Sequence, residues 1–137
     1  MQMKAGIVEY RVPYADTDQM GFVYYGNYLT YFERSRNELM RAWGFTYKEL
    51  EAMGVGMPVI EASVKYHAPA KYDDLLTIRG VLTELHGVRA KVSCTVMRGD
   101  VLIAEGWTMH VFIDLATGRP VRIPRKILDT FQASPEG

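Results

Sequence analysis

Two aspartates separated by a single residue, Asp16 and Asp18, stand just ahead of a segment that has the pattern of a helix start. A carboxylate in such a place can attack an electrophilic carbon or take a proton from water. The first N–H groups of a helix have no partner within the helix and carry partial positive charge, so they can polarise a nearby carbonyl. This pair is therefore the candidate for chemistry, and the rest of the chain must position it.

Composition argues against several other functions. The 16 basic and 16 acidic residues cancel, so no overall positive field draws the chain to nucleic acid or anionic membranes. Cys94 stands alone, and no CxxC or Cys/His cluster offers ligands for zinc. Charges at Lys4 and Glu9 interrupt the N-terminus, which argues against a signal peptide or membrane span. We expect one cytoplasmic domain over residues 1–137.

The helical segment has recognisable ends. Asn27 is a good N-cap, and Gly44 suits the position just past the C-terminus. Small or apolar residues recur at three- and four-residue spacing and are expected on one face: Tyr28, Tyr31, Phe32, Ser35, Leu39, Ala42 and Trp43. The polar flanks are expected to carry Glu33, Arg34, Arg36 and Glu38. A second short helix is predicted over residues 46–53, where Thr46 and Glu49 match a capping box.

Alternating polarity predicts strands near residues 5–12 and 58–66, and longer strands follow near 75–85, 88–98 and 101–114. The short links at His86-Gly87 and Gly99-Asp100 suit antiparallel hairpins. One long helix with this much apolar surface needs a curved antiparallel sheet around it, which is an α+β fold. Residues 101–104 are apolar on both faces, so part of the sheet is expected to meet another subunit in at least a homodimer. The last residues, 133–137, are expected to be a loose tail.

Two segments resemble the motifs of a known family. Residues 16–36 resemble the DxDxxGxVYxxNYxxxxExAR signature of hotdog-fold acyl-CoA thioesterases of the 4-hydroxybenzoyl-CoA thioesterase type, with Ser35 in place of alanine. Residues 66–76 are similar to the second recurring block of that family. The resemblance covers nearly the whole chain and implies the hotdog fold, in which a curved antiparallel sheet wraps one long central helix.

The resemblance assigns roles within the first segment. The catalytic carboxylate of the family corresponds to Asp18, acting as nucleophile or as general base for water. Its oxyanion contact corresponds to the backbone N–H of Tyr25, and the neighbouring Gly26 and Asn27 are expected to contact substrate. The implied reaction is hydrolysis of an acyl-CoA thioester to a free acid and coenzyme A, without metal or redox cofactor. Asp16 is expected to shape the loop, since aspartates accept hydrogen bonds from backbone N–H groups two residues on.

Other parts of the substrate suggest further candidates. His67 is expected either to line the acyl or pantetheine channel or to be a hydrogen-bonded structural residue. The phosphates of coenzyme A call for basic side chains, and Arg89 and Arg119 are the first candidates. The depth of the acyl pocket is expected to depend on Phe22, Tyr28, Tyr31, Ile60 and Trp107.

Two other functions use the same fold. A dehydratase relies on a histidine paired with an acid on the helix, and no histidine occurs before His67. A non-catalytic module that binds acyl-CoA or acyl carrier protein would keep the channel without needing Asp18. The family builds tetramers from one type of dimer in more than one way, so a homotetramer made as a dimer of dimers is expected, with acyl carrier protein as a further candidate partner.

Overall fold

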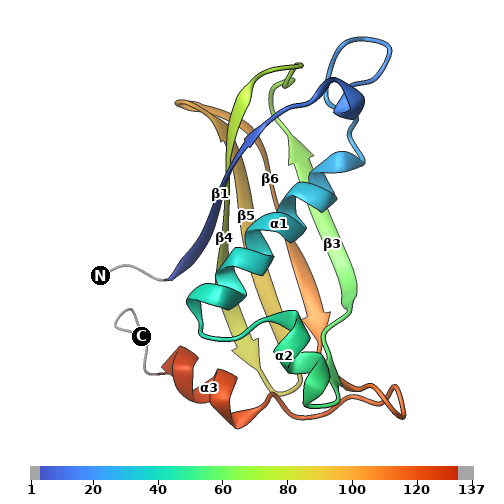
Figure 1. The fold of residues 1–137 in the computed structure, drawn as a ribbon, viewed down its shortest axis with the longest axis vertical. Helices are drawn as coiled ribbons and strands as arrows, with labels where there is room; N and C mark the ends of the chain where they lie inside the picture. The colour runs from blue at the N-terminus through green and yellow to red at the C-terminus, as the bar shows by residue number, and fades with distance from the viewer. Residues whose placement is uncertain (1–3, 133–137) are drawn as a thin grey trace.

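The computed structural model describes residues 4–132, in which one long helix lies against an antiparallel sheet (Figure 1). The sheet strands are β1 (Ala5–Arg11), β3 (Val59–Tyr66), β4 (Leu75–His86), β5 (Arg89–Arg98) and β6 (Val101–Val111). Two short strands, β2 (Val55–Gly56) and β7 (Ile113–Asp114), pair separately. The helices are the 3₁₀ turn η1 (Tyr14–Asp16), α1 (Asn27–Ala42), α2 (Tyr47–Ala52) and α3 (Arg125–Gln132). The expected tail at residues 133–137 lies outside the described residues.

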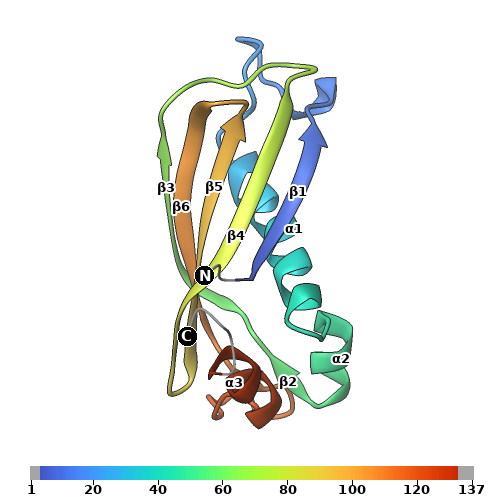
Figure 2. The same cartoon turned by 90° about the vertical axis from the view of Figure 1, so that its left-hand side faces the viewer.

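The sheet has the strand order β1-β4-β5-β6-β3, and every neighbouring pair is antiparallel. Both predicted hairpins are present, and their glycines, Gly87 and Gly99, have positive φ values of 65° and 57°. The sheet curves round α1 on one face, and no helix of the described chain covers the other face (Figure 2). This is the α+β arrangement that we predicted, with β1 and β3 as its edges.

The buried face of α1 confirms most of the helical pattern. Its buried residues are Tyr28, Tyr31, Phe32, Ser35, Arg36, Leu39 and Met40. Three expectations were wrong. The N-cap is Gly26, because the Asn27 side chain is turned away to donate to the carbonyl of Asp16. Ala42 is exposed, and Arg36 is buried in the core instead of lying on a polar flank.

The predicted ends of both helices are otherwise confirmed. Gly44 follows the C-cap Trp43 with a φ of 94°, a conformation that glycine adopts without strain. Thr46 accepts a hydrogen bond from the backbone of Glu49, and the Glu49 side chain accepts one from the backbone of Thr46. This capping box fixes the start of α2.

Small residues set the distance between α1 and the sheet. A Cβ atom added to Gly6 in β1 would lie 2.0 Å from the carbonyl oxygen of Ser35 and 2.2 Å from the backbone nitrogen of Leu39. A Cβ added to Gly80 in β4 would lie 2.7 Å from Oγ of Ser35. The Ser35 hydroxyl donates to the carbonyl of Phe32, so its polar atom is satisfied within the core. The helix can therefore pack directly on the backbone of the strands.

Helix α3 and the β2–β7 pair were not predicted from the sequence. α3 brings Ile127 into the core, and the N–H groups of Ile127 and Leu128 donate to the carbonyl of Pro124. A proline just ahead of an apolar pair is a helix-start signal, but eight residues give too few turns for a clear period. β2 and β7 have two residues each, so neither carries a detectable alternation.

A chain of polar side chains crosses the core beside α1. Arg36 donates from Nε to the Tyr47 hydroxyl at 2.6 Å and from Nη1 to Oγ1 of Thr108 at 3.5 Å. Oγ1 of Thr108 lies 2.8 Å from Nε2 of His110, and Nδ1 of His110 lies 3.0 Å from the carbonyl oxygen of Met57. A neutral imidazole with its proton on Nδ1 satisfies both contacts, because Nδ1 then donates to Met57 while Nε2 accepts from Thr108.

This network predicts acid sensitivity. Burial lowers the pKa of His110 from 6.5 to about 4, the Arg36 charge acts in the same direction, and the hydrogen bond to Met57 opposes them. Below pH 6.5 the unfolded chain binds a proton at His110, whereas the folded chain binds it only at about pH 4. The free energy of unfolding therefore decreases as the pH falls between these values. We expect a loss of about 2–3 kcal/mol from this residue between about pH 7 and pH 4.5.

Urea unfolding of wild type and His110→Gln at the two pH values measures this loss. The variant should be less stable near neutrality but should show a shallower pH dependence, since glutamine does not titrate. An equal decrease in both proteins would show that other groups carry the acid sensitivity.

Candidate active site

Asp18 lies in a tight loop between η1 and α1, and the backbone fixes one of its carboxylate oxygens. Oδ1 accepts hydrogen bonds from the N–H groups of Met20 at 2.9 Å and Phe22 at 3.2 Å. The loop is closed by the Asp18 N–H, which donates to the Phe22 carbonyl, and by Gly21, which has a φ of 85° and donates to the Asp18 carbonyl. Within residues 4–132 no hydrogen-bond or ion-pair partner is found for Oδ2. Asp18 thus presents one oriented and uncommitted oxygen.

The side chain of Asp16 is held by hydrogen bonds to two tyrosines. Its Oδ2 accepts hydrogen bonds from the hydroxyls of Tyr10 and Tyr31, both at 2.7 Å. Burial and then the contact with Asp16 raise the pKa of Tyr10 to about 12, and the same two causes raise the pKa of Tyr31 further. The Asp16 carbonyl accepts from the N–H of Tyr24 and from Nδ2 of Asn27. Asp16 therefore holds the loop, as expected, but through tyrosines; the bonds to nearby N–H groups that we expected of Asp16 are made by Asp18.

The backbone ahead of α1 supplies two N–H groups without an internal acceptor. The Tyr24 N–H is used by Asp16, and the Asn27 N–H donates to the Tyr24 carbonyl. Between them, the N–H groups of Tyr25 and Gly26 have no acceptor within the described part of the chain. They precede the first turn of α1, where the helix dipole adds to their partial positive charge. Such groups suit an oxygen on which negative charge develops.

These elements border an open pocket of about 360 Å³. It is lined by Asp18, Met20, Phe22, Val23, Tyr25, Tyr28, Tyr66, His67, Ala68 and Pro69. Burial raises the pKa of Tyr28 to about 12 and also raises that of Tyr66, so both phenols remain neutral near pH 7. The walls are therefore mainly apolar and aromatic, with Asp18 as the one carboxylate among the lining residues.

The last residue of β3 and the residue that follows it line the pocket and make hydrogen bonds to other parts of the chain. The hydroxyl of Tyr66 donates to the carbonyl of Tyr25 at 3.0 Å. His67 lines the pocket, as one of our two interpretations required, and its Nε2 also lies 2.8 Å from Oε2 of Glu105. Sequence reasoning missed the role of Tyr66, although its place at the start of the second family block was an available signal.

Only some of the side chains that we expected to line the acyl pocket do so. Phe22 and Tyr28 line the pocket, whereas the Tyr31 hydroxyl is used by Asp16. Trp107 and Ile60 do not line it, so these two expectations were wrong. Trp107 lies on the face of the sheet away from α1, because it alternates with Gly106 and Thr108, which face inward.

Arg89 and Arg119 lie far from Asp18 in the same chain. The Asp18 loop bridges to Lys71 just before β4, whereas Arg89 follows the hairpin at the other end of β4. A strand of 12 residues spans roughly 40 Å. Arg119 follows β7, which pairs with β2 beside the start of β3, and His67 follows the end of β3. Neither arginine lines the pocket around Asp18.

Comparison with known proteins identifies the family of this chain. The family model of the thioesterase-like superfamily matches residues 12–131. The chain belongs to this superfamily. It is 32% identical over 122 residues to a putative esterase of Aquifex aeolicus, covering 89% of this chain and 94% of the relative. It is also 32% identical over 123 residues to the acyl-CoA thioester hydrolase YbgC of Escherichia coli, covering 89% and 92% of the two chains.

A solved structure of a hypothetical protein from Thermus thermophilus superposes on this thioesterase-like chain with a TM-score of 0.86 and 34% identity, covering 93% of this chain and 95% of the other. The family and the hotdog fold inferred from the DxDxxG segment are thus confirmed. In the part of the chain that the structure describes, no helix combines the length and the apolar character that crossing a membrane requires.

Proposed function

We propose that this protein hydrolyses acyl-CoA thioesters, with Asp18 as the reacting carboxylate and the N–H groups of Tyr25 and Gly26 as the donors to the thioester oxygen. The observation that supports the proposal most strongly is that the two carboxylate oxygens of Asp18 have different surroundings. Oδ1 is fixed by two backbone N–H groups while Oδ2 is uncommitted beside an open, largely apolar pocket. The activities named for the relatives, such as acyl-CoA thioester hydrolase, support the same reaction.

Two chemical routes use the same atom. As a nucleophile, Oδ2 bonds to the thioester carbon, the thiolate of coenzyme A leaves, and water hydrolyses the resulting mixed anhydride. As a general base, Oδ2 takes a proton from water, the hydroxide adds to the carbonyl carbon, and the departing thiolate receives the proton. In a single turnover in ¹⁸O-labelled water, label in Asp18 identifies the first route. Label found only in the product acid shows that water attacks the acyl carbon, as the second route requires.

A panel of acyl- and aroyl-CoA esters, followed by release of free thiol, tests the activity. Saturable hydrolysis is expected, and the preferred ester identifies the acyl class that fits the aromatic walls. Saturable binding without turnover would favour the non-catalytic module instead. An acyl carrier protein loaded with the preferred acyl group tests whether a carrier can replace coenzyme A.

The hydroxyl of Tyr66 is predicted to position the oxyanion donors. It holds the peptide group between Tyr25 and Gly26 by its carbonyl, on the opposite side from the Gly26 N–H. Tyr66→Phe removes this hydrogen bond, which is worth about 1 kcal/mol, so we expect kcat to fall roughly five-fold with KM nearly unchanged. The aromatic wall stays in place, and steady-state kinetics of the two proteins measures the split. An increase in KM at constant kcat would assign Tyr66 to substrate binding alone.

We infer that the site is completed by a homodimer. β3 is an edge strand that exposes the apolar side chains of Val59, Ile60 and Tyr66, at 44%, 48% and 49%. Unpaired edges with apolar side chains favour pairing with another strand. Antiparallel pairing of β3 with its own copy would bring the start of the partner's β3, together with the neighbouring Arg119, beside Tyr66 and His67. On this arrangement the partner subunit's Arg119 binds the phosphates of coenzyme A at the Asp18 pocket.

Subunit mixing tests this arrangement. Asp18→Asn and Arg119→Ala are each expected to be weakly active at low substrate concentration, the second through a raised KM. When they are mixed and allowed to exchange, half of the dimers combine the two chains, and one site in each has a wild-type Asp18 and a wild-type Arg119 from different subunits. Activity should then return to about a quarter of wild type. If Arg119 acts within its own chain, mixing restores nothing.

A further inference from the structure

We propose that His67, held by Glu105, is the base that activates water in the second step of the reaction, after Asp18 has taken the acyl group. This inference rests on the proposed function and commits it to the nucleophilic route, in which the acyl group passes through a mixed anhydride. His67 is a catalytic residue in this scheme because it contacts the attacking water. Glu105 is a positioning residue that acts through His67.

The nucleophilic route requires a second base. Once Oδ2 of Asp18 has bonded to the acyl carbon, the carboxylate has lost its negative charge and cannot take a proton from water. Burial raises the pKa of Tyr28 to about 12 and also raises that of Tyr66, so neither phenol is a base near pH 7. His67 is the one imidazole among the residues that line the Asp18 pocket, and imidazole exchanges protons near neutral pH.

The contact between His67 and Glu105 decides which ring nitrogen can act as the base. Nε2 of His67 lies 2.8 Å from Oε2 of Glu105. A carboxylate only accepts hydrogen bonds, so Nε2 carries the ring proton and, in the neutral ring, Nδ1 has the lone pair. Within residues 4–132 no hydrogen-bond partner is found for Nδ1. This nitrogen is therefore available to a water molecule in the pocket.

The backbone fixes His67 at the edge of the pocket. His67 directly follows β3, and its N–H donates to the carbonyl of Ile103 in β6 at 2.8 Å. The N–H of Ala68 donates to the same carbonyl at 3.2 Å. Because β6 also carries Glu105, the imidazole and the carboxylate that holds it are anchored to the same strand.

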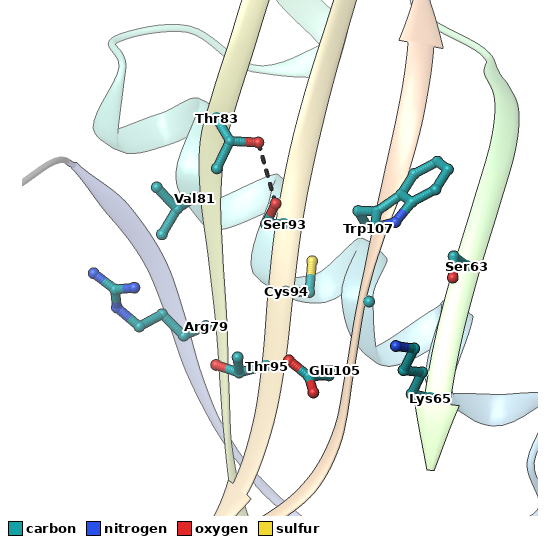
Figure 3. A pocket seen from close by; sticks show the side chains of 11 residues that line it. Ser63, Lys65, Arg79, Val81, Thr83, Ser93, Cys94, Thr95, Glu105 and Trp107 are labelled. Carbon is teal, nitrogen blue, oxygen red and sulfur yellow. Dashed lines mark hydrogen bonds between the residues drawn. The ribbon is translucent and has the colours of Figure 1, made fainter.

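Glu105 is available to serve His67. Figure 3 shows Glu105 on the sheet face away from α1, between Thr95 and Lys65, where it borders a hollow of about 470 Å³. Both of these residues are its partners in the strand register, but its only ion-pair partner in the described part of the chain is His67. The carboxylate charge stabilises the imidazolium that forms when Nδ1 takes a proton. The side chains of His67 and Glu105 are 40% and 46% exposed, so water screens part of this effect.

The reaction then has two chemical steps. In the first, Oδ2 of Asp18 bonds to the thioester carbon, and the bond to sulfur breaks with its electron pair on sulfur, which gives the anhydride and the thiolate of coenzyme A. In the second, Nδ1 of His67 takes one proton from water while the water oxygen bonds to a carbonyl carbon of the anhydride. The bond from that carbon to the bridging oxygen breaks, which frees the product acid and Asp18. The imidazolium gives its proton to the thiolate, so coenzyme A leaves as the thiol.

Thiol release in the first turnover separates the two steps. His67→Gln keeps a side chain that can donate a hydrogen bond to Glu105 but has no basic nitrogen. Formation of the anhydride does not use His67, so one equivalent of thiol per active site should appear at the wild-type rate. A steady state roughly 10²- to 10³-fold slower than that of wild type should follow, because the anhydride accumulates. Rapid-quench and stopped-flow measurements with the preferred ester give both rates, and circular dichroism checks the fold.

Glu105→Gln tests the positioning residue. Glutamine can still accept a hydrogen bond from Nε2 of His67 but has no charge, so we expect the same burst of thiol with a smaller loss in the steady state, roughly ten-fold. The matched controls make the same exchanges elsewhere: His86→Gln changes an exposed histidine at the end of β4, and Glu84→Gln changes a glutamate that pairs with Lys91. Both should keep the wild-type time course.

The outcomes separate this inference from the proposed function. If His67→Gln slows the first thiol as much as the steady state, or keeps wild-type kinetics, the role of His67 is overturned while hydrolysis by Asp18 stands. Wild-type kinetics in Glu105→Gln, or a burst in either control, would also overturn it. If wild type releases no thiol from any ester of the panel, or if Asp18→Asn still gives the burst, the proposed function fails and the role of His67 fails with it.

Discussion

Asp18→Asn is expected to lower kcat by roughly 10²- to 10⁴-fold with little change in KM. The amide has the shape of the carboxylate, and its oxygen can still accept from the N–H groups of Met20 and Phe22, so the loop should remain in place. What is lost is the negative charge and basicity at the position of Oδ2. Rates of thiol release over a range of substrate concentrations measure the effect, which corresponds to about 3–5 kcal/mol of transition-state stabilisation.

The control for this variant is Asp73→Asn. Asp73 is an exposed aspartate with a φ of 72°, a conformation that asparagine also tolerates, and its only ion pair in the described chain is a 4.0 Å contact with Arg11. It should keep wild-type kinetics. Retention of turnover in Asp18→Asn, alongside an unaffected control, would exclude Asp18 as either nucleophile or base.

Gly6→Ala is expected to cost about 3 kcal/mol or more of folding stability, a large part of the 5–15 kcal/mol of a typical domain. The new methyl group would occupy the space of the Ser35 carbonyl oxygen and the Leu39 nitrogen, at 2.0 and 2.2 Å. Both are backbone atoms in the middle of α1, so no side-chain rotation can relieve the overlap. The helix must move away from β1, which opens the core along its length.

Urea unfolding at neutral pH measures the loss, with Gly56→Ala as the matched control. A Cβ added to Gly56 would lie 2.8 Å from Cδ2 of Leu115, the end of a flexible and exposed side chain that can turn aside. The control should therefore change stability by less than about 1 kcal/mol. Similar losses in the two variants would mean that the distance between α1 and β1 is not set by Gly6.

Several features of the fold could be predicted from the sequence because each depends on residues that are close together along the chain. The start of α2 at Thr46 and Glu49, the glycine end of α1 and the hairpin glycines are local hydrogen-bond and backbone requirements. The period of α1 reflects burial of one side of that helix, whereas most positions of β3 are exposed on both faces of the strand. The DxDxxG segment marked the candidate site for the same reason, since its loop is closed by bonds between residues no more than four apart.

Other features depended on which strands and helices become neighbours. The sequence predicts Arg36 on the helix surface, because its hydrogen-bond partners Tyr47 and Thr108 come from other elements. Asp16 was assigned a local role because Tyr10 and Tyr31, its partners, come from β1 and α1. Trp107 was assigned to the pocket because composition alone does not say which face of β6 meets α1.

The sequence by itself therefore determined the family, the α+β elements and the identity of the candidate carboxylate, since these are encoded in short-range spacing. The tertiary structure decided which tyrosines line the pocket, which tyrosines hold Asp16 and where the basic residues lie. These properties arise from contacts between residues that are distant in sequence. Such contacts cannot be predicted from the spacing of the residues along the chain.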